Sequence, residues 1–332
     1  MKQILVIRFS SIGDLVLTTP ILRRLKATFP KATLDVLTKP AYCTILQGNP
    51  ALRTIFTTEN FKAETRYDLV VDLQNNIASH RYHRIGENIV VYRKENWKKM
   101  LLVWFKVNLY RQYESVVERY AKGLKRFGVC LDEHGCEIFL SDAERAFGKA
   151  HRGKLPVLAV CVGARHFTKR FPSERFAEVL NHLLNKRAVE IWLLGGKADA
   201  PFAASVSEAL KRKDTVKDFS GRYTLRETAS LIASADAVLS NDTGLMHIAA
   251  AFQKPIVVLF GSSVKEFGFL PYKAPFTLLE VEGLACRPCS HIGRQRCPKS
   301  HFKCMHDIPT EQILRAVETA LEPSRKSKEA WG

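Results

Sequence analysis

The first half of the chain alternates continuous apolar runs with segments in which apolar residues recur at helical spacing. Gln3 to Phe9 is a nearly unbroken apolar run, the pattern of a strand buried on both faces of a parallel sheet. A helical pattern follows and stops at Pro30, because proline ends a helix. The elements predicted in this half are strands at residues 3–9, 33–37 and 68–73 and helices at 15–29 and 116–127.

The same rhythm restarts after a polar stretch at residues 142–154. The elements predicted in this half are strands at residues 157–162, 189–194, 237–240 and 256–260 and helices at 173–184, 200–211, 225–234 and 245–252. Repeated strand–helix units imply parallel sheets with helices on both faces. The sequence therefore predicts an α/β protein of two Rossmann-like, doubly wound lobes.

The division of the chain suggests its domains. We expect an N-terminal lobe over residues 1–150, a C-terminal lobe over 155–309, a final helix over 310–322 and a disordered polar tail over 323–332. With 332 residues and 46% hydrophobic content, the chain can bury two cores. Its first apolar run is too short for a signal peptide, and no run reaches the roughly twenty apolar residues of a spanning helix. We therefore expect a cytoplasmic protein.

An excess of basic residues narrows the range of partners. Lys and Arg number 51 against 33 Asp and Glu, which gives a formal net charge of +18. This charge favours nucleic acid, an anionic membrane face or a phosphorylated substrate, although a solvated basic surface has the same composition. A nucleic-acid binder would carry exposed aromatics among its basic residues in a recognised module. None appears, so we expect no nucleic acid.

Ligands of doubly wound sheets bind beyond the carboxyl ends of the strands, so the chemistry is expected in the loops there. The first such loop is Ser10-Ser11-Ile12-Gly13-Asp14, in which Gly13 permits a tight turn into the helix. The pattern leaves two interpretations of Asp14 open. It is either a helix N-cap or a general base that deprotonates an acceptor hydroxyl.

Two loops of the second half carry cations or glycines. Arg165 and Lys169 precede a predicted helix start, a combination suited to a diphosphate or to a merely solvated basic loop. Gly195 and Gly196 let the backbone approach a ligand, and Asp199 is a candidate to bond a ribose or a base. Double glycines after strands also occur as plain turns.

The densest polar cluster is Asp242-Thr243-Gly244 with His247, between a predicted strand and helix. Backbone N–H groups of Thr243 and Gly244 are candidates to cradle a phosphate, and His247 follows about one turn later on the ligand side. The alternative is that Asp242 caps the helix and His247 is packed. The functional interpretation predicts a carboxylate of the first lobe facing a cationic pocket of the second.

These blocks together resemble glycosyltransferase family 9, the ADP-heptose:lipopolysaccharide heptosyltransferases. The blocks that carry the resemblance are residues 4–14 with Thr18-Thr19-Pro20, then 68–74, 169–176, 194–196 and 242–250. The similarity extends from about residue 3 to residue 320. It implies a GT-B fold that binds the acceptor on its first lobe and the donor on its second. It also implies an inverting reaction that needs no metal ion.

The resemblance also implies roles for residues. Asp14 matches the family's catalytic base, Lys169 its diphosphate-binding lysine, and Tyr223 a position where members place backbone against the adenine. The candidate donor-binding residues are Gly13, Arg165, Lys169, Gly195, Gly196, Asp199, Tyr223, Asp242, Thr243, Gly244 and His247. The candidate acceptor-binding residues are Ser10, Ser11, Gln74 and Asn75.

The implied substrates are ADP-heptose and a lipid-linked lipopolysaccharide core. One alternative is a family 9 transferase that uses another nucleotide-diphosphate sugar. A rival outside enzymes is a basic nucleotide- or nucleic-acid-binding protein.

Four of the eight cysteines fall close together, at Cys286, Cys289, Cys297 and Cys304. Four thiolates suit a zinc site, but the second pair lacks the close spacing of well-behaved zinc ribbons. We expect reduced, packed cysteines and no metal cofactor, with zinc and a redox disulfide as alternatives. A similar Cys-x-Pro-Cys segment occurs in the second-heptose branch of the family, so the resemblance favours that branch.

Residues 94–111 interleave aromatic residues with cations, as in Trp97, Trp104 and Tyr110 among Lys98, Lys99, Lys106 and Arg111. The segment is either an amphipathic helix packed on the first lobe or a helix that rests on an anionic membrane face. A lipid-linked acceptor is compatible with peripheral contact with the inner membrane.

Overall fold

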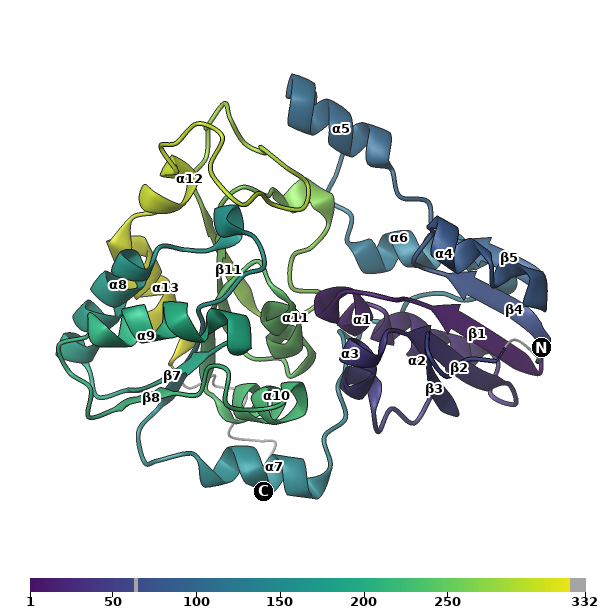
Figure 1. Ribbon diagram of the computed structural model, residues 1–332, viewed down its shortest axis with the longest axis horizontal. Helices are drawn as coiled ribbons and strands as arrows, with labels where there is room; N and C mark the ends of the chain where they lie inside the picture. The colour runs from purple at the N-terminus through teal and green to yellow at the C-terminus, as the bar shows by residue number, and fades with distance from the viewer. Residues whose placement is uncertain (63–64, 323–332) are drawn as a thin grey trace.

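The computed structural model describes residues 1–62 and 65–322, and the predicted tail at 323–332 lies outside the described residues. Two all-parallel sheets organise the chain, as predicted (Figure 1). The first has the strand order β3-β2-β1-β4-β5 and the second the order β11-β10-β9-β6-β7-β8. The strands are β1 (Gln3–Ile7), β2 (Thr33–Thr38), β3 (Thr54–Thr57), β4 (Tyr67–Asp72), β5 (Gly86–Val91), β6 (Val157–Cys161), β7 (Glu190–Leu194), β8 (Val216–Asp218), β9 (Ala237–Asn241), β10 (Ile256–Phe260) and β11 (Phe276–Glu280).

All seven predicted strands are present, and the structure adds four that the apolar pattern missed. The added strands are β3, β5, β8 and β11, which are the two edges of each sheet. An edge strand is less covered than a central one, so it carries fewer apolar residues. None of the residues of β3 or β8 is fully buried, whereas every residue of β6 is.

The helices flank these strands. They are α1 (Ile12–Val16), α2 (Thr19–Thr28), α3 (Pro40–Cys43), α4 (Ile77–His80), α5 (Asn96–Phe105), α6 (Val116–Lys122), α7 (Asp142–Ala150), α8 (Ser173–Lys186), α9 (Ala200–Glu208), α10 (Leu225–Ser234), α11 (Gly244–Ala251), α12 (Lys303–His306) and α13 (Thr310–Ala320). Short 3-10 turns include η4 (Phe167–Lys169) and η5 (Lys197–Asp199). Among the described residues, no helix combines the length and the apolarity needed to cross a membrane.

The single helix predicted over residues 15–29 was wrong. The structure has two helices there, α1 and α2, with a break at Leu17–Thr18. Pro20 lies in the first turn of α2, where its missing N–H costs nothing and its fixed φ favours a new helix start. The break turns α1 into a short element whose first turn carries Asp14.

The polar stretch at 142–154, predicted to separate the halves, contains helix α7. Ser141 accepts a hydrogen bond from the Glu144 N–H, and the Glu144 side chain bonds back to the Ser141 N–H, which is a capping box. Glu144 also pairs with Arg226 of α10, so α7 packs on the second half of the chain. The domain boundary at residue 150 stays a prediction.

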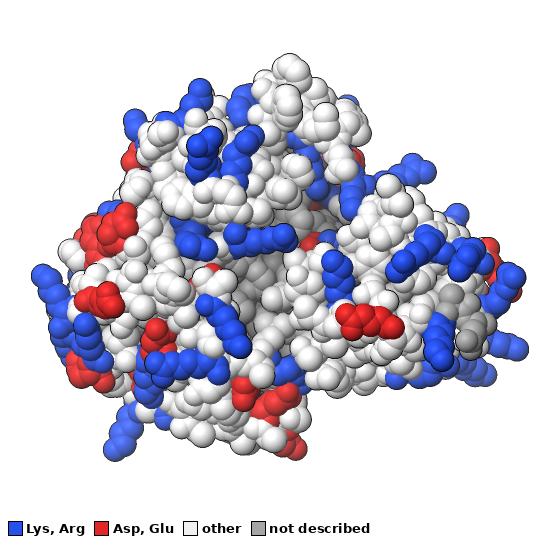
Figure 2. All heavy atoms as spheres, in the orientation of Figure 1, with Lys and Arg blue, Asp and Glu red and all other residues white. Residues whose placement is uncertain are grey.

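Both faces of each sheet are buried. Alternate residues of β1 enter two different apolar clusters, Ile4 and Val6 on one face and Leu5 and Ile7 on the other. The cluster that holds Ile4 and Val6 extends without interruption under the second sheet. The halves also meet at α1 and α11 (Figure 1), and a hollow lies between them with Lys and Arg at its rim (Figure 2).

Candidate active site between the two sheets

Asp14 lies in the first turn of α1, beyond the carboxyl end of β1. Its Oδ1 is 2.6 Å from Arg8 Nη2, and its side chain is only 15% exposed. Its Oδ2 accepts hydrogen bonds from the N–H and the hydroxyl of Ser11, at 2.9 and 3.1 Å. Ser11 is the N-cap, so Asp14 supports the helix start from three residues further on. The N-cap interpretation of Asp14 was therefore wrong in detail, because Ser11 is the N-cap and Asp14 completes the capping box from the third position of the helix.

The environment keeps Asp14 ionised. Burial alone would raise the pKa of this carboxyl, but the Arg8 guanidinium and the hydrogen bonds from Ser11 hold the pKa below its usual value. Tyr120 lies against the same carboxylate, with its hydroxyl 3.5 Å from Oδ1, and burial raises the pKa of Tyr120 well above its ordinary value. The phenol therefore stays protonated beside a permanent carboxylate.

Lys169 and Asp242 form the cationic side of the site. The Lys169 Nζ lies 2.7 Å from Asp242 Oδ2, and the two side chains are 16% and 8% exposed. Ser263 donates a hydrogen bond of 2.7 Å to the same oxygen. Burial acts to raise the pKa of Asp242, yet Lys169 and Ser263 lower it below the usual value. Asp242 is therefore the present counter-ion of Lys169, in the position that a ligand anion would compete for.

The start of α11 has polar atoms without partners. Thr243 is the N-cap, not Asp242, and its side chain makes no capping bond. Among the described residues, Thr243 Oγ1 and His247 Nδ1 are buried with no hydrogen-bond partner. Buried polar groups are usually paired, and each unpaired one costs free energy. Two such atoms at one helix N-terminus indicate a place completed by a ligand.

His247 links the two sides. It is 3% exposed, and burial lowers its pKa to about 4. The carboxylates of Asp242 and Asp14 raise that pKa, and the Lys169 ammonium lowers it, so His247 lies among all three charges. A Cβ on Gly13 would be 2.5 Å from His247 Cδ2, which shows how tightly the first lobe approaches α11 here. At neutral pH the imidazole is uncharged.

The loops after β6 and β7 meet at Asp199. Its carboxylate fills the space beside Gly163, where a Cβ would lie 2.1 Å from Asp199 Cγ, and its Cβ lies against Gly195. Its Oδ2 accepts a bond of 3.0 Å from the Gly196 N–H. Any larger residue at Gly163 would displace Asp199. The carboxylate thus bridges two strand ends, which is where a ribose or base contact was predicted.

The backbone two residues before Tyr223 contacts these loops, since the Gly221 N–H donates to Gly195 O at 3.0 Å. Gly221 approaches Lys197 and Ala200, with 3.2 Å between its would-be Cβ and the Lys197 Cα. The Tyr223 ring packs against the rings of Phe147 and Phe219, and its hydroxyl lies 3.1 Å from His151 Nε2. The side chain is therefore bonded to protein, and the implied contact between the backbone here and the adenine stays a prediction.

The predicted acceptor residues lie together at the ends of β1 and β4, which are adjacent strands. Gln74 Oε1 accepts from the Phe9 N–H at 3.0 Å, and Asn75 donates to Tyr92 O at 2.8 Å. Ser10 O accepts from Arg8 Nε at 2.8 Å. Ser11 is exposed and is bonded directly to Asp14, and Gln74 and Asn75 follow the adjacent strand β4.

Arg165 was predicted to bind the donor, but it forms no bond with the other described residues of the site. Its side chain is exposed, and the structure gives it no ion pair or hydrogen bond among the described residues. Its neighbour Arg170 instead donates to Ala164 O at 2.8 Å and lies 3.9 Å from Asp199. Arg170 is thus better placed than Arg165 to reach a ligand bound at the loops after β6 and β7.

Three site residues were missed from the sequence. Arg8 is a charge inside a buried strand run, which is a usable signal for a paired residue. Ser263 follows β10 in a loop without a distinctive pattern. Lys99 of α5 lies near the site, and burial together with Arg119 lowers its pKa to about 8 while the Asp14 carboxylate raises it. Because Lys99 lies in an apolar segment, no local sequence pattern marked it as a site residue.

One group of side chains has the geometry of a metal site. Potential ligand atoms of Asp72, His80 and His83 lie within 4.8 Å of one another. The Asp72 carboxylate, however, already accepts bonds from Gln74 N, Asn75 N and Ser79 Oγ and lies 2.9 Å from His83 Nε2. Protein donors thus fill its acceptor positions, and a structural role accounts for the group.

Comparison with known proteins decides the family. The sequence profile described as "Glycosyltransferase family 9 (heptosyltransferase)" matches residues 62–299, well over half of the chain. The chain belongs to glycosyltransferase family 9. Its resemblance to that family is thereby confirmed, and this family 9 protein is a glycosyltransferase.

Its relatives agree with the predicted branch. Lipopolysaccharide heptosyltransferase 2 of Salmonella typhimurium is 27% identical over 309 residues, covering 80% of this chain and 84% of that protein. The solved glycosyl transferase family 9 protein of Veillonella parvula superposes with a TM-score of 0.77 at 20% identity, covering 97% and 98% of the two chains. Escherichia coli ADP-heptose LPS heptosyltransferase II gives 0.75 at 22%, covering 99% and 100%. The fold is GT-B, as predicted.

Proposed function

We propose that this family 9 transferase moves a heptose from ADP-heptose onto an acceptor sugar of the lipopolysaccharide inner core. The reaction would invert the anomeric centre and use no metal ion on the departing diphosphate. Two similar proteins support the substrates by their names, the Salmonella typhimurium lipopolysaccharide heptosyltransferase 2 and the Escherichia coli ADP-heptose enzyme.

The observation that carries the proposal is the meeting of two unlike sites at His247. The ionised Asp14 approaches from the first sheet, and the Lys169–Asp242 pair with the unpaired Thr243 hydroxyl approaches from the second. An inverting transfer needs one base on the acceptor side and one charge clamp on the donor side. The arrangement has one of each.

On the acceptor side, Asp14 would take the proton of the attacking hydroxyl. As the new bond from the acceptor oxygen to C1 of the heptose forms, that hydroxyl becomes more acidic and its proton passes to the carboxylate. Arg8 keeps Asp14 ionised, and Ser11 fixes its orientation, so the base is ready before substrate binds. Its low pKa limits its strength as a base but guarantees its charge state.

On the donor side, the bond from C1 to the diphosphate oxygen would break, and ADP would leave with the electron pair. Lys169 and the N-terminus of α11 would stabilise the charge that develops on the diphosphate. The diphosphate would replace Asp242 as the partner of Lys169, and Ser263 would keep Asp242 bonded after that exchange. Neutral His247 would offer its free Nδ1 to the sugar or phosphate.

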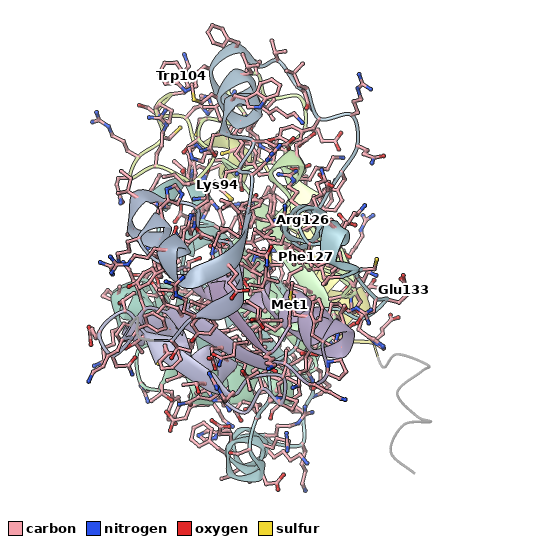
Figure 3. The ribbon with its side chains drawn as sticks, turned by 90° about the vertical axis from the view of Figure 1, so that its right-hand side faces the viewer. Met1, Lys94, Trp104, Arg126, Phe127 and Glu133 are labelled. Carbon is pink, nitrogen blue, oxygen red and sulfur yellow. The ribbon has the colours of Figure 1, made fainter. Side chains whose placement is uncertain are left out.

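The membrane contact has its own support. Helix α5 projects from the body of the molecule (Figures 1 and 3), and Leu102 is its one fully buried residue. Its C-cap residue Lys106 donates to Pro288 O at 2.7 Å. Trp104 and Phe105 are 76% and 70% exposed, which favours the membrane-resting interpretation over packing on the first lobe. Beneath α5 lies a groove of about 1070 Å³ lined by five cations, Arg93, Lys94, Arg119, Lys122 and Arg126.

This groove joins the membrane side to the acceptor residues, because Asn75 also lines it. We therefore propose that the enzyme works at the cytoplasmic face of the inner membrane, with α5 in the headgroup layer and the groove facing anionic groups. Vesicles with and without anionic lipid test this: binding should require anionic lipid and weaken in Trp104→Ser/Phe105→Ser. Phe276→Ser, an exposed apolar residue elsewhere, is the matched control. Equal binding by all three proteins would contradict the placement.

The reaction itself is tested by a panel of nucleotide-diphosphate sugars and inner-core acceptors. ADP release and the mass of the product should identify ADP-heptose as the preferred donor and an inner-core glycolipid as the acceptor. Preference for another nucleotide-diphosphate sugar would keep the mechanism and change the substrate. ADP affinity without any transfer would remove the proposal.

A further inference from the structure

The segment between β11 and α12, residues 281–302, has no helix or strand. Irregular segments of this length are uncommon in compact domains unless they serve a function. Phe302 is its one large apolar side chain that is fully buried, so it has almost no apolar core of its own. A few of its apolar residues, such as Val281 and Leu284, pack on the second core, and the rest of its shape depends on polar contacts such as those of Arg287.

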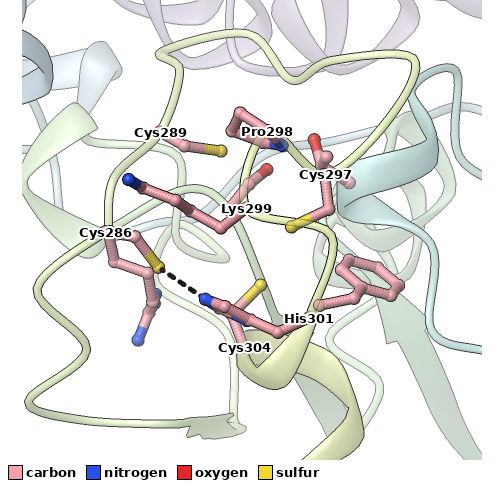
Figure 4. A pocket seen from close by; sticks show the side chains of 11 residues that line it. Cys286, Cys289, Cys297, Pro298, Lys299, His301 and Cys304 are labelled. Carbon is pink, nitrogen blue, oxygen red and sulfur yellow. Dashed lines mark hydrogen bonds between the residues drawn. The ribbon is translucent and has the colours of Figure 1, made fainter.

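Four cysteines of this region line one small enclosed cavity. The cysteine cluster consists of Cys286, Cys289, Cys297 and Cys304. All four thiols are free, and the cavity has a volume of about 10 Å³, room for one particle the size of a water molecule. Figure 4 shows the sulfur atoms turned toward the space between them.

We propose that the cysteine cluster binds one metal ion through four thiolates. Four sulfur ligands select soft or borderline ions in tetrahedral geometry, which means zinc or iron in a protein. Each thiol that binds would release its proton to solvent. The resulting site would carry a negative charge, and the cations Arg287 and Lys299, which also line the cavity, would balance it.

His301 would support the site without binding the ion. Its Nδ1 accepts a hydrogen bond of 3.0 Å from the Lys303 N–H, so the proton of the neutral ring is on Nε2. That Nε2 lies 3.8 Å from Cys286 Sγ (Figure 4) and donates toward the sulfur. An N–H directed at a ligand sulfur stabilises the thiolate form.

The four sulfur atoms lie further apart than they would around a bound ion. In the described part of the chain, the one set of three potential ligand atoms within 4.8 Å is the Asp72 group. Ligation would therefore draw the thiols inward, by side-chain rotation within a segment that has no regular structure.

The proposed ion would brace the donor side of the cleft. The Arg294 N–H donates to Thr168 Oγ1 at 2.8 Å, and the Thr168 N–H donates to Arg294 O at 3.1 Å, directly before Lys169. Arg287 donates to the backbone oxygen of Ser263 at 2.8 Å, and the Ser263 hydroxyl holds Asp242. A fixed cysteine segment would thus position both members of the Lys169–Asp242 pair, a positioning role that rests on the proposed function.

The metal content of the full chain, purified untagged under anaerobic reducing conditions, tests the site. We expect about one equivalent of zinc or iron per chain, with elemental analysis distinguishing the two. Cys289→Ser/Cys297→Ser should lose it, whereas Cys43→Ser/Cys130→Ser, at two cysteines outside the cluster, should keep it. Circular dichroism establishes that each variant is folded. Should the cluster variant fail to fold, cobalt titration of the metal-stripped wild type replaces it, and the visible bands of tetrahedral thiolate cobalt are expected.

Three results would overturn the proposal: no bound metal and no cobalt bands, equal metal in the two double variants, or a disulfide between cluster cysteines in the native protein. His301→Asn should retain the ion, and a loss as complete as that of the cluster variant would show that the ligand set is wrong. Metal content is measured without substrate, so a failure of the transferase proposal would leave this test unaffected. Removing the ion should also weaken ADP binding about tenfold, and unchanged ADP affinity would refute the positioning role.

Discussion

The two sides of the cleft differ in whether their buried polar atoms already have hydrogen-bond partners in the protein. On the first lobe, both oxygens of Asp14 have partners, with Arg8 on one and Ser11 on the other. On the second lobe, Thr243 Oγ1 and His247 Nδ1 are buried and unpaired among the described residues. The proposed base is held by protein alone, whereas the proposed donor pocket has polar atoms that are still available to a ligand.

This difference indicates which side is organised in advance. A base that must act on a weakly acidic hydroxyl benefits from a fixed position, and its bonds to Arg8 and Ser11 supply that. Unpaired buried groups cost free energy until a ligand meets them, so part of the donor's binding energy comes from relieving that cost. Substitutions on the first lobe should therefore change rate, and those on the second should change affinity as well.

Asp14→Asn should have the largest effect. The amide oxygen can still accept from the Ser11 N–H, so the helix start is preserved while the negative charge is lost. A positioned base contributes roughly 10²–10⁴-fold, and kcat should fall by that range with ADP affinity nearly unchanged. Steady-state kinetics and calorimetry measure the two quantities. Normal turnover would reduce Asp14 to a helix-supporting residue.

Lys169→Met should reduce both kcat and the affinity for ADP. The variant removes the cation that now pairs with Asp242 and leaves that carboxylate near the incoming diphosphate. Loss of one charge-stabilising donor costs roughly 10²–10³ in kcat, and ADP affinity should drop as well. Arg165→Met, at an exposed cation of the same loop, is the matched control and should lose much less. If the two variants behave alike, the charge clamp is not at Lys169.

Arg8→Gln should move the pH dependence of turnover. In the proposed mechanism Asp14 acts as the carboxylate, so activity should be present above its pKa and be lost as the pH falls through it. Arg8 holds that pKa low, and its removal should shift the acidic limb of kcat/KM upward by about 1–3 pH units. Arg8→Lys keeps the positive charge and should shift the limb far less. An unmoved limb in Arg8→Gln would mean that it reports another group.

The sequence was most informative where the chain is most buried. Every central strand was predicted, because a strand covered on both faces must be apolar throughout, as β6 and β10 are. The four edge strands were missed for the converse reason. In β5 the residues Glu87 and Asn88 are exposed, so its pattern is that of a loop.

The site residues also divide into those that the sequence predicts and those that it does not. Residues in loops after strands were predicted because topology alone places those loops at one edge of the sheet. Arg8 and Ser263 were not, since their roles depend on which side chain lies opposite, as Asp14 lies opposite Arg8 and Asp242 opposite Ser263. Such pairings arise from the contact between elements distant in sequence, which no local pattern encodes.

Gly13→Ala probes the contact between the two sides. Alanine favours a helix by about 0.5–1 kcal/mol over glycine, but its Cβ would lie 2.5 Å from His247 Cδ2. Overpacking of a tight contact costs about 1–3 kcal/mol, so the clash should win and the free energy of unfolding should fall. Gly196→Ala is the control, because its nearest contact would be 3.8 Å. Equal stability of both variants would show that the lobes separate readily at α1 and α11.

The smallest effects should come from two hydroxyls that differ only in whether protein already bonds them. The Tyr223 hydroxyl lies 3.1 Å from His151 Nε2, so Tyr223→Phe should lower the free energy of unfolding by about 0.5–1.5 kcal/mol and leave ADP affinity within about twofold. The Thr243 hydroxyl is buried without a partner, so Thr243→Val should leave stability equal or higher and weaken ADP binding roughly fivefold, the equivalent of one hydrogen bond. Thermal unfolding and ADP titration of both variants give the four values needed. A loss of ADP affinity in Tyr223→Phe, or of stability in Thr243→Val, would mean that the donor pocket is completed by protein as fully as the surroundings of Asp14.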